Sequence, residues 1–299
     1  MSRINGVEII DTYAEAFPMW VGRVLITAIS RDWAMIAAKT TTGFGTSLIM
    51  CPAEAAIDVE LSASDTPNKR PGVSVIIGAS SKKKLASQLL ARVSQCVLTC
   101  PTTAVFNALE TSEITFDIGK KISFFGDGYQ TEDDINDRHV WVIPTMEGDF
   151  IIEENFGGRK GVAGGNFLIL GERLETTLKA TEEAVKAINA VENVFLPFPG
   201  GICRSGSKVG SKYKFLGAST NQKYCPTLKG KVSDSELPED VNCVYEIVIN
   251  GVSEETVGEA MKMGIQAAVK VPGIKRITAA NYGGTLGPYK IQLHEILGL

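Results

Sequence analysis

The chain has 299 residues, of which 44% are hydrophobic and 21% charged, and its formal net charge is −4. This is the composition of an ordinary globular protein, and it excludes a disordered or fibrous chain. No run reaches the ~18 apolar residues that a membrane helix needs, and the segment before Phe17 mixes acidic with apolar residues, unlike a signal peptide. We therefore expect a cytoplasmic protein that does not enter a membrane.

In the N-terminal half, the pattern predicts strands around one clear helix. Residues 73–78 form a β-rich apolar run, and after it Leu85, Leu89 and Val93 share one face of a helix. Further runs are typical of strands and cover residues 23–29, 33–38, 47–50 and 140–144.

In the C-terminal half, the pattern repeats one order of elements. A strand at 166–171 precedes a helix with an apolar stripe from Leu174 to Ile188, and a strand at 193–197 follows it. A second set comprises a strand at 243–249, a helix from Val257 to Ala268 with Ser253 as its N-cap, and a strand at 274–278.

These elements in series give β-α-β-β-α-β, the arrangement of ferredoxin-like sandwiches. We therefore predict an α+β protein with two ferredoxin-like α/β sandwich lobes and largely antiparallel sheets. The lobes are expected to cover residues 1–150 and 151–299, because an acidic stretch at 147–154 gives way there to a glycine-rich one at 157–165.

Six cysteines and two histidines offer few candidates for a metal or a nucleophile. The cysteines form no C-x-x-C pair, and His139 and His294 are far apart in sequence, whereas zinc sites draw on clustered Cys and His. No G-x-S-x-G motif occurs. The run 201–208 resembles a phosphate-binding P-loop, but its lysine does not directly follow the glycine. We expect reduced thiols, no metal site and no nucleotide hydrolysis.

Glu246 is the most informative single residue, because it interrupts an otherwise apolar strand. Alternation places it on one strand face with Val244 and Val248. Burying an ionised carboxylate costs several kcal/mol unless it is paired or takes up a proton. Glu246 therefore either has a raised pKa, which lets it act as an acid or hydrogen-bond donor, or forms an ion pair with a nearby Lys or Arg.

Residues 193–233 contain no Asp or Glu but seven basic residues, which are Arg204, Lys208, Lys212, Lys214, Lys223, Lys229 and Lys231. Such a segment favours an anion-binding site. A nucleic-acid surface is not expected, because the chain is acidic overall and has no RNA-binding motif. Glycine-rich loops with aromatic residues at 124–129, 197–201 and 281–284 either approach and stack on a flat ligand or form tight turns with core aromatics.

Several segments together resemble the formylmethanofuran–tetrahydromethanopterin N-formyltransferase family. They run in order from end to end and include residues 11–17, 50–55, 124–128, 197–201, 206–212, 244–251 and 281–284. The resemblance implies an acyltransferase that moves a formyl group between N-formylmethanofuran and the N5 amine of tetrahydromethanopterin through a tetrahedral intermediate. It places this reaction in one-carbon metabolism, either methanogenesis or formaldehyde oxidation.

The resemblance also assigns roles and partners. It implies that Glu246 is a protonated catalytic donor and that both polyanionic coenzymes are substrates, with no tightly bound cofactor. It implies a homodimer or homotetramer whose site lies near the subunit interface. The expected substrate-binding residues are Glu54, Phe125, Asp127, Tyr129, Phe198, Gly200, Gly201, Arg204, Ser207, Lys208 and Lys212.

We expect Arg204, Lys208 and Lys212 to orient the anionic tails of the coenzymes. Two alternatives remain open on the sequence. One is a hydrolase of the formyl coenzyme, and the other is a non-catalytic ligand-binding subunit of a formyltransferase/hydrolase complex.

Overall fold

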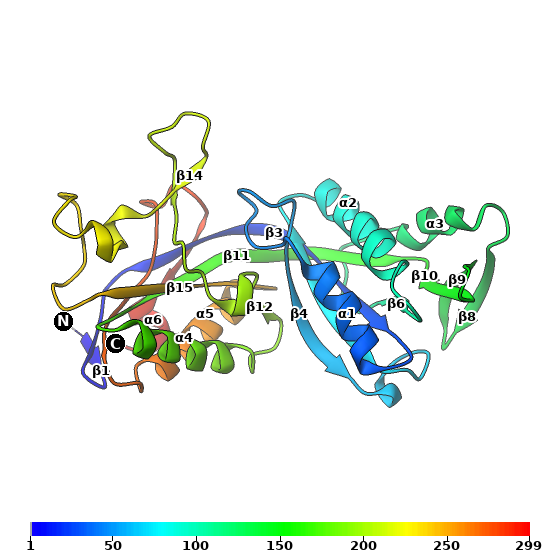
Figure 1. Ribbon diagram of the computed structural model, residues 1–299, viewed down its shortest axis with the longest axis horizontal. Helices are drawn as coiled ribbons and strands as arrows, with labels where there is room; N and C mark the ends of the chain where they lie inside the picture. The colour runs from blue at the N-terminus through cyan, green and yellow to red at the C-terminus, as the bar shows by residue number, and fades with distance from the viewer. Residues whose placement is uncertain (1) are drawn as a thin grey trace. The chain divides into compact units, whose positions relative to one another are not determined.

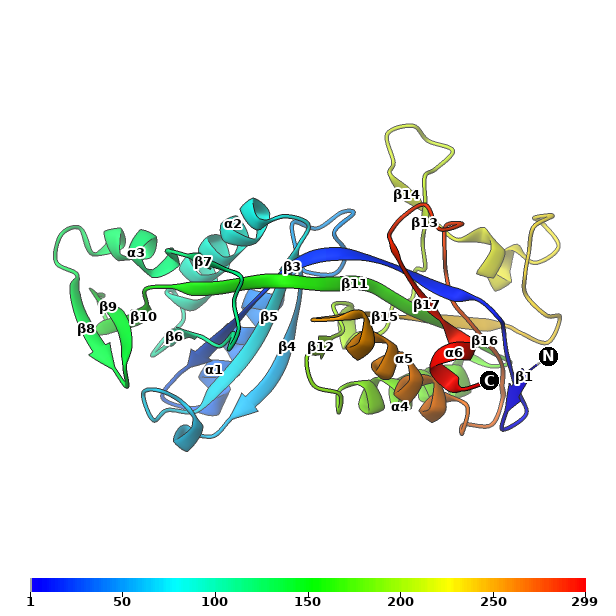
Figure 2. The same ribbon diagram turned by 180° about the vertical axis from the view of Figure 1, so that it is seen from behind.

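The structure is a computed structural model that describes residues 2–299, and the chain forms two compact units (Figures 1 and 2). The terminal unit comprises residues 2–18 and 161–299, and the central unit comprises residues 19–160. The chain passes from one unit to the other within β3 (Tyr13–Thr27) and within β11 (Phe156–Gly171). These units differ from lobes of 1–150 and 151–299, because the N-terminal strands pair with strands near the C-terminus.

The central unit contains a β-α-β-β-α-β motif. In chain order its elements are β3, α1 (Arg31–Thr42), β4 (Glu54–Leu61), β5 (Gly72–Ala79), α2 (Lys82–Arg92) and β6 (Ala104–Asn107). The strands lie in the order β4-β5-β3-β6, and each neighbouring pair is antiparallel. Apolar residues of α1, α2 and β5 share one core. The predicted ferredoxin-like arrangement is therefore confirmed in this unit.

The sheet of the central unit continues beyond β6 through β10 (Asp149–Glu153), β9 (Arg138–Pro144) and β8 (Thr131–Ile135). Shorter elements complete the unit, namely η1 (Ala63–Asp65), η2 (Val93–Val97), β7 (Ile114–Phe116), α3 (Ile118–Ser123) and η3 (Phe124–Gly126). Of these, β7, α3 and η3 follow the β-α-β-β-α-β motif in the chain.

Helix α1 corrects the prediction of a strand at 33–38. Ser30 caps this helix by accepting a hydrogen bond from the backbone N–H of Trp33. Ala34, Ala37 and Ala38 are fully buried at helical spacing, and alanine is the strongest helix former. Trp33 is partly exposed, so the apolar run is not a buried strand. Residues 47–50, also expected as a strand, form a turn instead.

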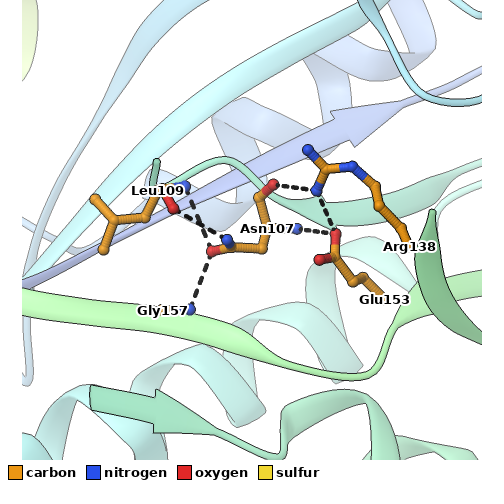
Figure 3. Close-up of polar contacts among 5 residues, drawn as sticks. All are labelled: Asn107, Leu109, Arg138, Glu153 and Gly157. Atoms are coloured by element: carbon orange, nitrogen blue, oxygen red, sulfur yellow. Dashed lines mark hydrogen bonds and ion pairs between the residues drawn. The ribbon is translucent and has the colours of Figure 1, made fainter. Parts of the chain in front are cut away.

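A polar cluster ties the end of β6 to β9, β10 and β11 in the central unit (Figure 3). The side-chain oxygen of Asn107 accepts hydrogen bonds from the backbone N–H groups of Leu109 and Gly157, the latter at 3.0 Å. Arg138 forms an ion pair of 2.7 Å with Glu153 and donates to the Asn107 carbonyl. Glu153 also accepts the backbone N–H of Asn107.

The terminal unit repeats the motif. Its elements are β11, α4 (Leu174–Ile188), β12 (Val194–Phe195), β15 (Cys243–Gly251), α5 (Glu254–Ala268) and β16 (Ile274–Thr278). The strands lie in the order β12-β15-β11-β16, again with antiparallel neighbours. Ser253 caps α5, as its position in the sequence predicted, and it also forms a capping box with Thr256. Each of the two units therefore contains a ferredoxin-like sandwich, as the predicted fold class required.

Further strands extend the terminal unit at its edges. β16 pairs in parallel with β2 (Val7–Ile9), which pairs with β1 (Ser2–Ile4). Near the C-terminus, β17 (Tyr289–Gln292) pairs with the first residues of β3 and leads into α6 (Leu293–Leu297).

The two faces of this sheet are covered differently. Helices α4 and α5 pack against one face, where they form the larger apolar core (Figures 1 and 2). The segment 203–242 lies over the other face and forms little regular structure. Its short elements, with the turn before it, are η4 (Pro199–Gly201), β13 (Lys208–Val209), β14 (Ala218–Ser219), η5 (Gln222–Tyr224) and η6 (Pro226–Leu228).

Candidate active site

Glu246 lies on β15, on the sheet face that the helices do not cover. Its neighbours in the strand, Ile247 and Ile249, point into the core with α4 and α5. Because side chains alternate along a strand, Glu246 points to the opposite face, beneath the segment 203–242. It is only 9% exposed there, and it pairs with Leu168 of β11 in the sheet.

Cys203 is the closest partner of Glu246. Its backbone N–H donates to the Glu246 carbonyl at 2.8 Å, and the Glu246 N–H donates to the Cys203 carbonyl at 3.1 Å. The Cys203 thiol also affects the carboxyl group, since it lowers the pKa of Glu246. The segment 203–242 thus begins with a two-way backbone bridge to the strand that carries the carboxyl group.

Burial raises the pKa of Glu246 to about 7, and the Cys203 thiol opposes this effect only in part. The ion pairs among residues 2–299 do not include Glu246, and no lysine or arginine contributes to its pKa. Of the two interpretations that the sequence left open, the structure therefore supports the protonated carboxyl group. Near neutral pH about half of such groups hold a proton that can be donated to a ligand.

A cavity of about 300 Å³ opens beside Glu246 within the terminal unit. This is the lower end of the range for small-molecule sites. Its wall combines polar groups of the segment 203–227 with apolar groups of β11 and β15. The lining includes Leu168, Leu174, Cys203, Arg204, Ser205, Gly206, Ser207, Asn221, Tyr224, Val244, Tyr245, Glu246 and Ala280.

The structure brings three of the expected binding residues near this carboxyl group. Arg204 and Ser207 line the same cavity as Glu246. Lys208 lines a second cavity of about 350 Å³. The two cavities share Asn221, Tyr224 and Ala280 as lining residues. Lys212, also expected here, is exposed and lines neither of these two cavities.

Several charges of the basic segment hold the segment itself. The Lys229 ammonium donates to three backbone carbonyls, those of Pro238, Glu239 and Val241, at 3.0, 2.8 and 2.6 Å. Lys223 forms an ion pair of 2.7 Å with Glu236. Part of the positive charge of residues 193–233 therefore serves the structure of this segment.

The other expected residues lie elsewhere in the chain. Phe198, Gly200 and Gly201 belong to the turn around η4, and Gly201 is buried against Leu196 and Val185. In the central unit, Glu54 is buried and accepts the backbone N–H of Leu48 at 2.9 Å.

Phe125, Asp127 and Tyr129 also belong to the central unit. Phe125 and Tyr129 are exposed, and Phe125 lines a cavity of about 1270 Å³. Asp127 has a left-handed backbone with φ 51°. Their roles in binding remain predictions.

Sequence reasoning missed Cys203 and Tyr282. The Tyr282 hydroxyl donates to the Ser207 carbonyl at 3.3 Å, and its side chain lines the second cavity. Burial, followed by the nearby Glu246 carboxyl, raises the pKa of Tyr282. The sequence did mark Tyr282 as the aromatic residue of the glycine-rich loop 281–284. It gave no sign that Ser207 would be its hydrogen-bond partner.

His294 lies in α6, and its ring is 3.0 Å from the Ile9 carbonyl. Among residues 2–299, no group of three or more His, Cys, Asp or Glu residues could hold a metal ion. None of the helices formed by these residues is long and apolar enough to cross a membrane.

Comparison with protein families gives matches over nearly the whole chain. Residues 2–145 match the model described as formylmethanofuran-tetrahydromethanopterin formyltransferase, and residues 148–296 match that of the family's proximal lobe. Formyltransferases of this name from Methanococcoides burtonii and Methanothermus fervidus are 56% and 57% identical. Each alignment covers 98% of this chain and 99% of the relative.

Solved structures agree with these matches. A formylmethanofuran:tetrahydromethanopterin formyltransferase from Methanosarcina barkeri is 55% identical, with a TM-score of 0.93 over 99% of this chain and 100% of that chain. A chain of the formyltransferase/hydrolase complex from Methylorubrum extorquens, solved with methylofuran, is 43% identical with a TM-score of 0.94. That alignment covers 99% of this chain and 98% of the other.

Proposed function

Since the chain belongs to the formylmethanofuran–tetrahydromethanopterin formyltransferase family, we propose that Glu246 and its cavity carry the formyl transfer between the two coenzymes of that name. The observation that supports this site is the buried Glu246 carboxyl group, whose pKa is raised to about 7 beside a cavity of about 300 Å³. Such a group can donate a hydrogen bond where an ionised carboxylate would repel negative charge.

The reaction joins an amine to an N-formyl amide. The N5 amine of tetrahydromethanopterin attacks the formyl carbon of formylmethanofuran, and the carbonyl oxygen becomes an oxyanion in the tetrahedral intermediate. The protonated Glu246 donates a hydrogen bond to this oxygen. When the intermediate collapses, the C–N bond to methanofuran breaks, and the released amine takes up the proton that the attacking amine has lost. No bond to the protein is needed.

Arg204 and Lys208 are the basic groups best placed to bind the coenzymes. Both lie near Glu246, Arg204 in its cavity and Lys208 in the neighbouring one. Because both coenzymes carry anionic tails, we propose that these side chains orient them. Both coenzymes then act as substrates that bind and leave in each turnover.

The activity is tested by following the absorbance of formyl-tetrahydromethanopterin after mixing the purified protein with formylmethanofuran and the pterin. Glu246→Ala should lower kcat by about a hundredfold or more, the usual effect of losing an oxyanion donor, with unchanged circular dichroism. Formate release that does not require the pterin would instead indicate a hydrolase. Wild-type kcat in the variant would remove Glu246 from the mechanism.

We also propose that the enzyme is cytoplasmic and forms homodimers or homotetramers with the site near the subunit interface, as the family resemblance implies. The cysteines of the chain are free thiols, which suits a reducing compartment. Sedimentation analysis tests the assembly, and a monomer with full activity would contradict it. Cell fractionation tests the location.

A further inference from the structure

Glu15 lies in β3, within the terminal unit, and is almost completely buried at 1% exposure. Both of its carboxylate oxygens accept hydrogen bonds from the backbone of a single loop, residues 282–287. One oxygen accepts the N–H groups of Tyr282 at 2.8 Å and Gly284 at 3.1 Å. The other accepts those of Leu286 and of Gly287, the latter at 2.9 Å.

This arrangement requires the glycines of the loop. Gly283 and Gly284 have φ values of 69° and 77°, a left-handed region that glycine adopts without strain. Gly287 passes so close to the Ala16 carbonyl that a side chain there would overlap it. Although burial alone would raise the pKa of Glu15, the four amides lower it, so the group is a carboxylate at neutral pH.

The loop that Glu15 holds reaches toward the active site through Tyr282. The Tyr282 hydroxyl donates to the carbonyl of Ser207, which lines the Glu246 cavity. Ser207 follows closely after Cys203, whose backbone bridges to Glu246. Three hydrogen-bonded contacts, Glu15 to Tyr282, Tyr282 to Ser207 and Cys203 to Glu246, are thus linked through the short segment 203–207 within the terminal unit.

We propose that Glu15 is a positioning residue for formyl transfer, which fixes Tyr282 and through it the segment 203–207 over Glu246. This inference rests on the proposed function of the Glu246 site. A covering segment held in place keeps water away from the carboxyl group, and dry surroundings keep the proton on Glu246. Cys203 and Tyr282 are the titratable groups that act on or respond to the Glu246 carboxyl.

Glu15→Gln tests the proposal with little change in volume. The amide keeps one acceptor oxygen but turns an NH₂ group toward two backbone donors, which lose their acceptor. We expect faster amide hydrogen exchange in residues 203–207 as well as in 282–287. We also expect kcat to fall about tenfold or more, and the alkaline fall of kcat/KM to move to lower pH as Glu246 becomes hydrated.

Two further variants separate positioning from stability. Tyr282→Phe removes only the hydroxyl that holds Ser207, and should shift kcat and the pH profile in the same direction as Glu15→Gln. Glu153→Gln breaks a partly buried carboxylate contact in the central unit, and should lower the melting temperature while leaving the pH profile unchanged.

The proposal is overturned if Glu15→Gln loosens only residues 282–287 and retains the kcat and pH profile of the wild type. It is also overturned if Tyr282→Phe changes neither. The exchange measurement does not depend on turnover. If the wild-type protein fails to transfer formyl groups, the proposed function fails, and exchange at 203–207 in the variants still decides whether Glu15 positions this segment.

Discussion

Cys203 and Glu246 are joined by two backbone hydrogen bonds, of 2.8 and 3.1 Å, in which each residue donates to the carbonyl of the other. The bridge brings the start of an irregular segment onto β15, the strand that carries Glu246. It thereby places Arg204 and Ser207 in the same cavity as Glu246. The proposed binding groups and the proposed donor are thus held together by backbone hydrogen bonds.

The first prediction concerns the pH dependence of activity. Because the protonated form of Glu246 is the proposed donor, kcat/KM should fall as the pH rises through about 7. Measuring initial rates between pH 5.5 and 9, in steps of about half a unit, checks this fall. The residual rate of Glu246→Gln should lack it, since glutamine does not titrate. A fall of equal midpoint in the variant would assign the titration to another group.

The second prediction concerns stability. The pKa of Glu246 is raised in the folded state, so the folded protein holds a proton that the unfolded chain releases above about 4.5. The free energy of unfolding should therefore decline as the pH rises from about 4.5 to 7. The Glu246→Gln variant lacks this titrating group. Its free energy of unfolding relative to that of the wild type should therefore increase over the same pH interval.

Urea unfolding of both proteins at pH 5, 6, 7 and about 8 measures this difference. Glu8→Gln serves as the matched control, because Glu8 forms an ion pair with Arg276 instead of lying in a cavity. A constant difference between Glu246→Gln and the wild type would show that Glu246 has an ordinary pKa.

The third prediction concerns the anionic coenzymes. Arg204→Ala should raise the KM of one coenzyme by about tenfold, since a charge-assisted contact contributes roughly 1.5–3 kcal/mol. Lys208→Ala should raise the KM of a coenzyme to a smaller extent, because its ammonium is already engaged by Gln222. Lys231 is exposed and lines neither cavity, so Lys231→Ala is the control. Unchanged KM values for both coenzymes in Arg204→Ala would contradict a binding role.

The fourth prediction concerns the segment over the sheet. Lys229→Met removes the ammonium that holds the three carbonyls between 238 and 241, while it keeps an unbranched side chain only one atom shorter. Carbonyls left without a donor should destabilise the segment by about 1–3 kcal/mol. Limited proteolysis should then cleave within residues 226–241 sooner than in the wild type. The same substitution at Lys231 should leave the cleavage rate unchanged.

The sequence predicted the regular parts of the fold because their residues show the period of the element that they form. The stripe from Val257 to Ala268 and its cap at Ser253 are examples, and both are confirmed. Helix α1 was missed because a short apolar run has no period that distinguishes a helix from a strand. The buried state of Glu246 followed from its apolar neighbours in the strand.

The partners of Glu246 did not follow from the sequence. Cys203 and Tyr282 reach the site through irregular segments, whose course depends on backbone hydrogen bonds that leave no periodic signal. Glu15 illustrates the same limit, since its four amide partners lie more than 260 positions away in the chain. Such pairings appear only once tertiary structure is known.

The last prediction concerns the polar cluster of the central unit. Asn107→Ala leaves the backbone N–H groups of Leu109 and Gly157 without their acceptor, and buried donors without partners cost about 1–3 kcal/mol each. Thermal unfolding should therefore begin at a lower temperature. Asn155→Ala is the control, because the Asn155 side chain is exposed and its contact with Glu154 is long at 3.4 Å. Equal melting temperatures for the two variants would show that Arg138 and Glu153 hold β6, β9 and β10 together without the asparagine.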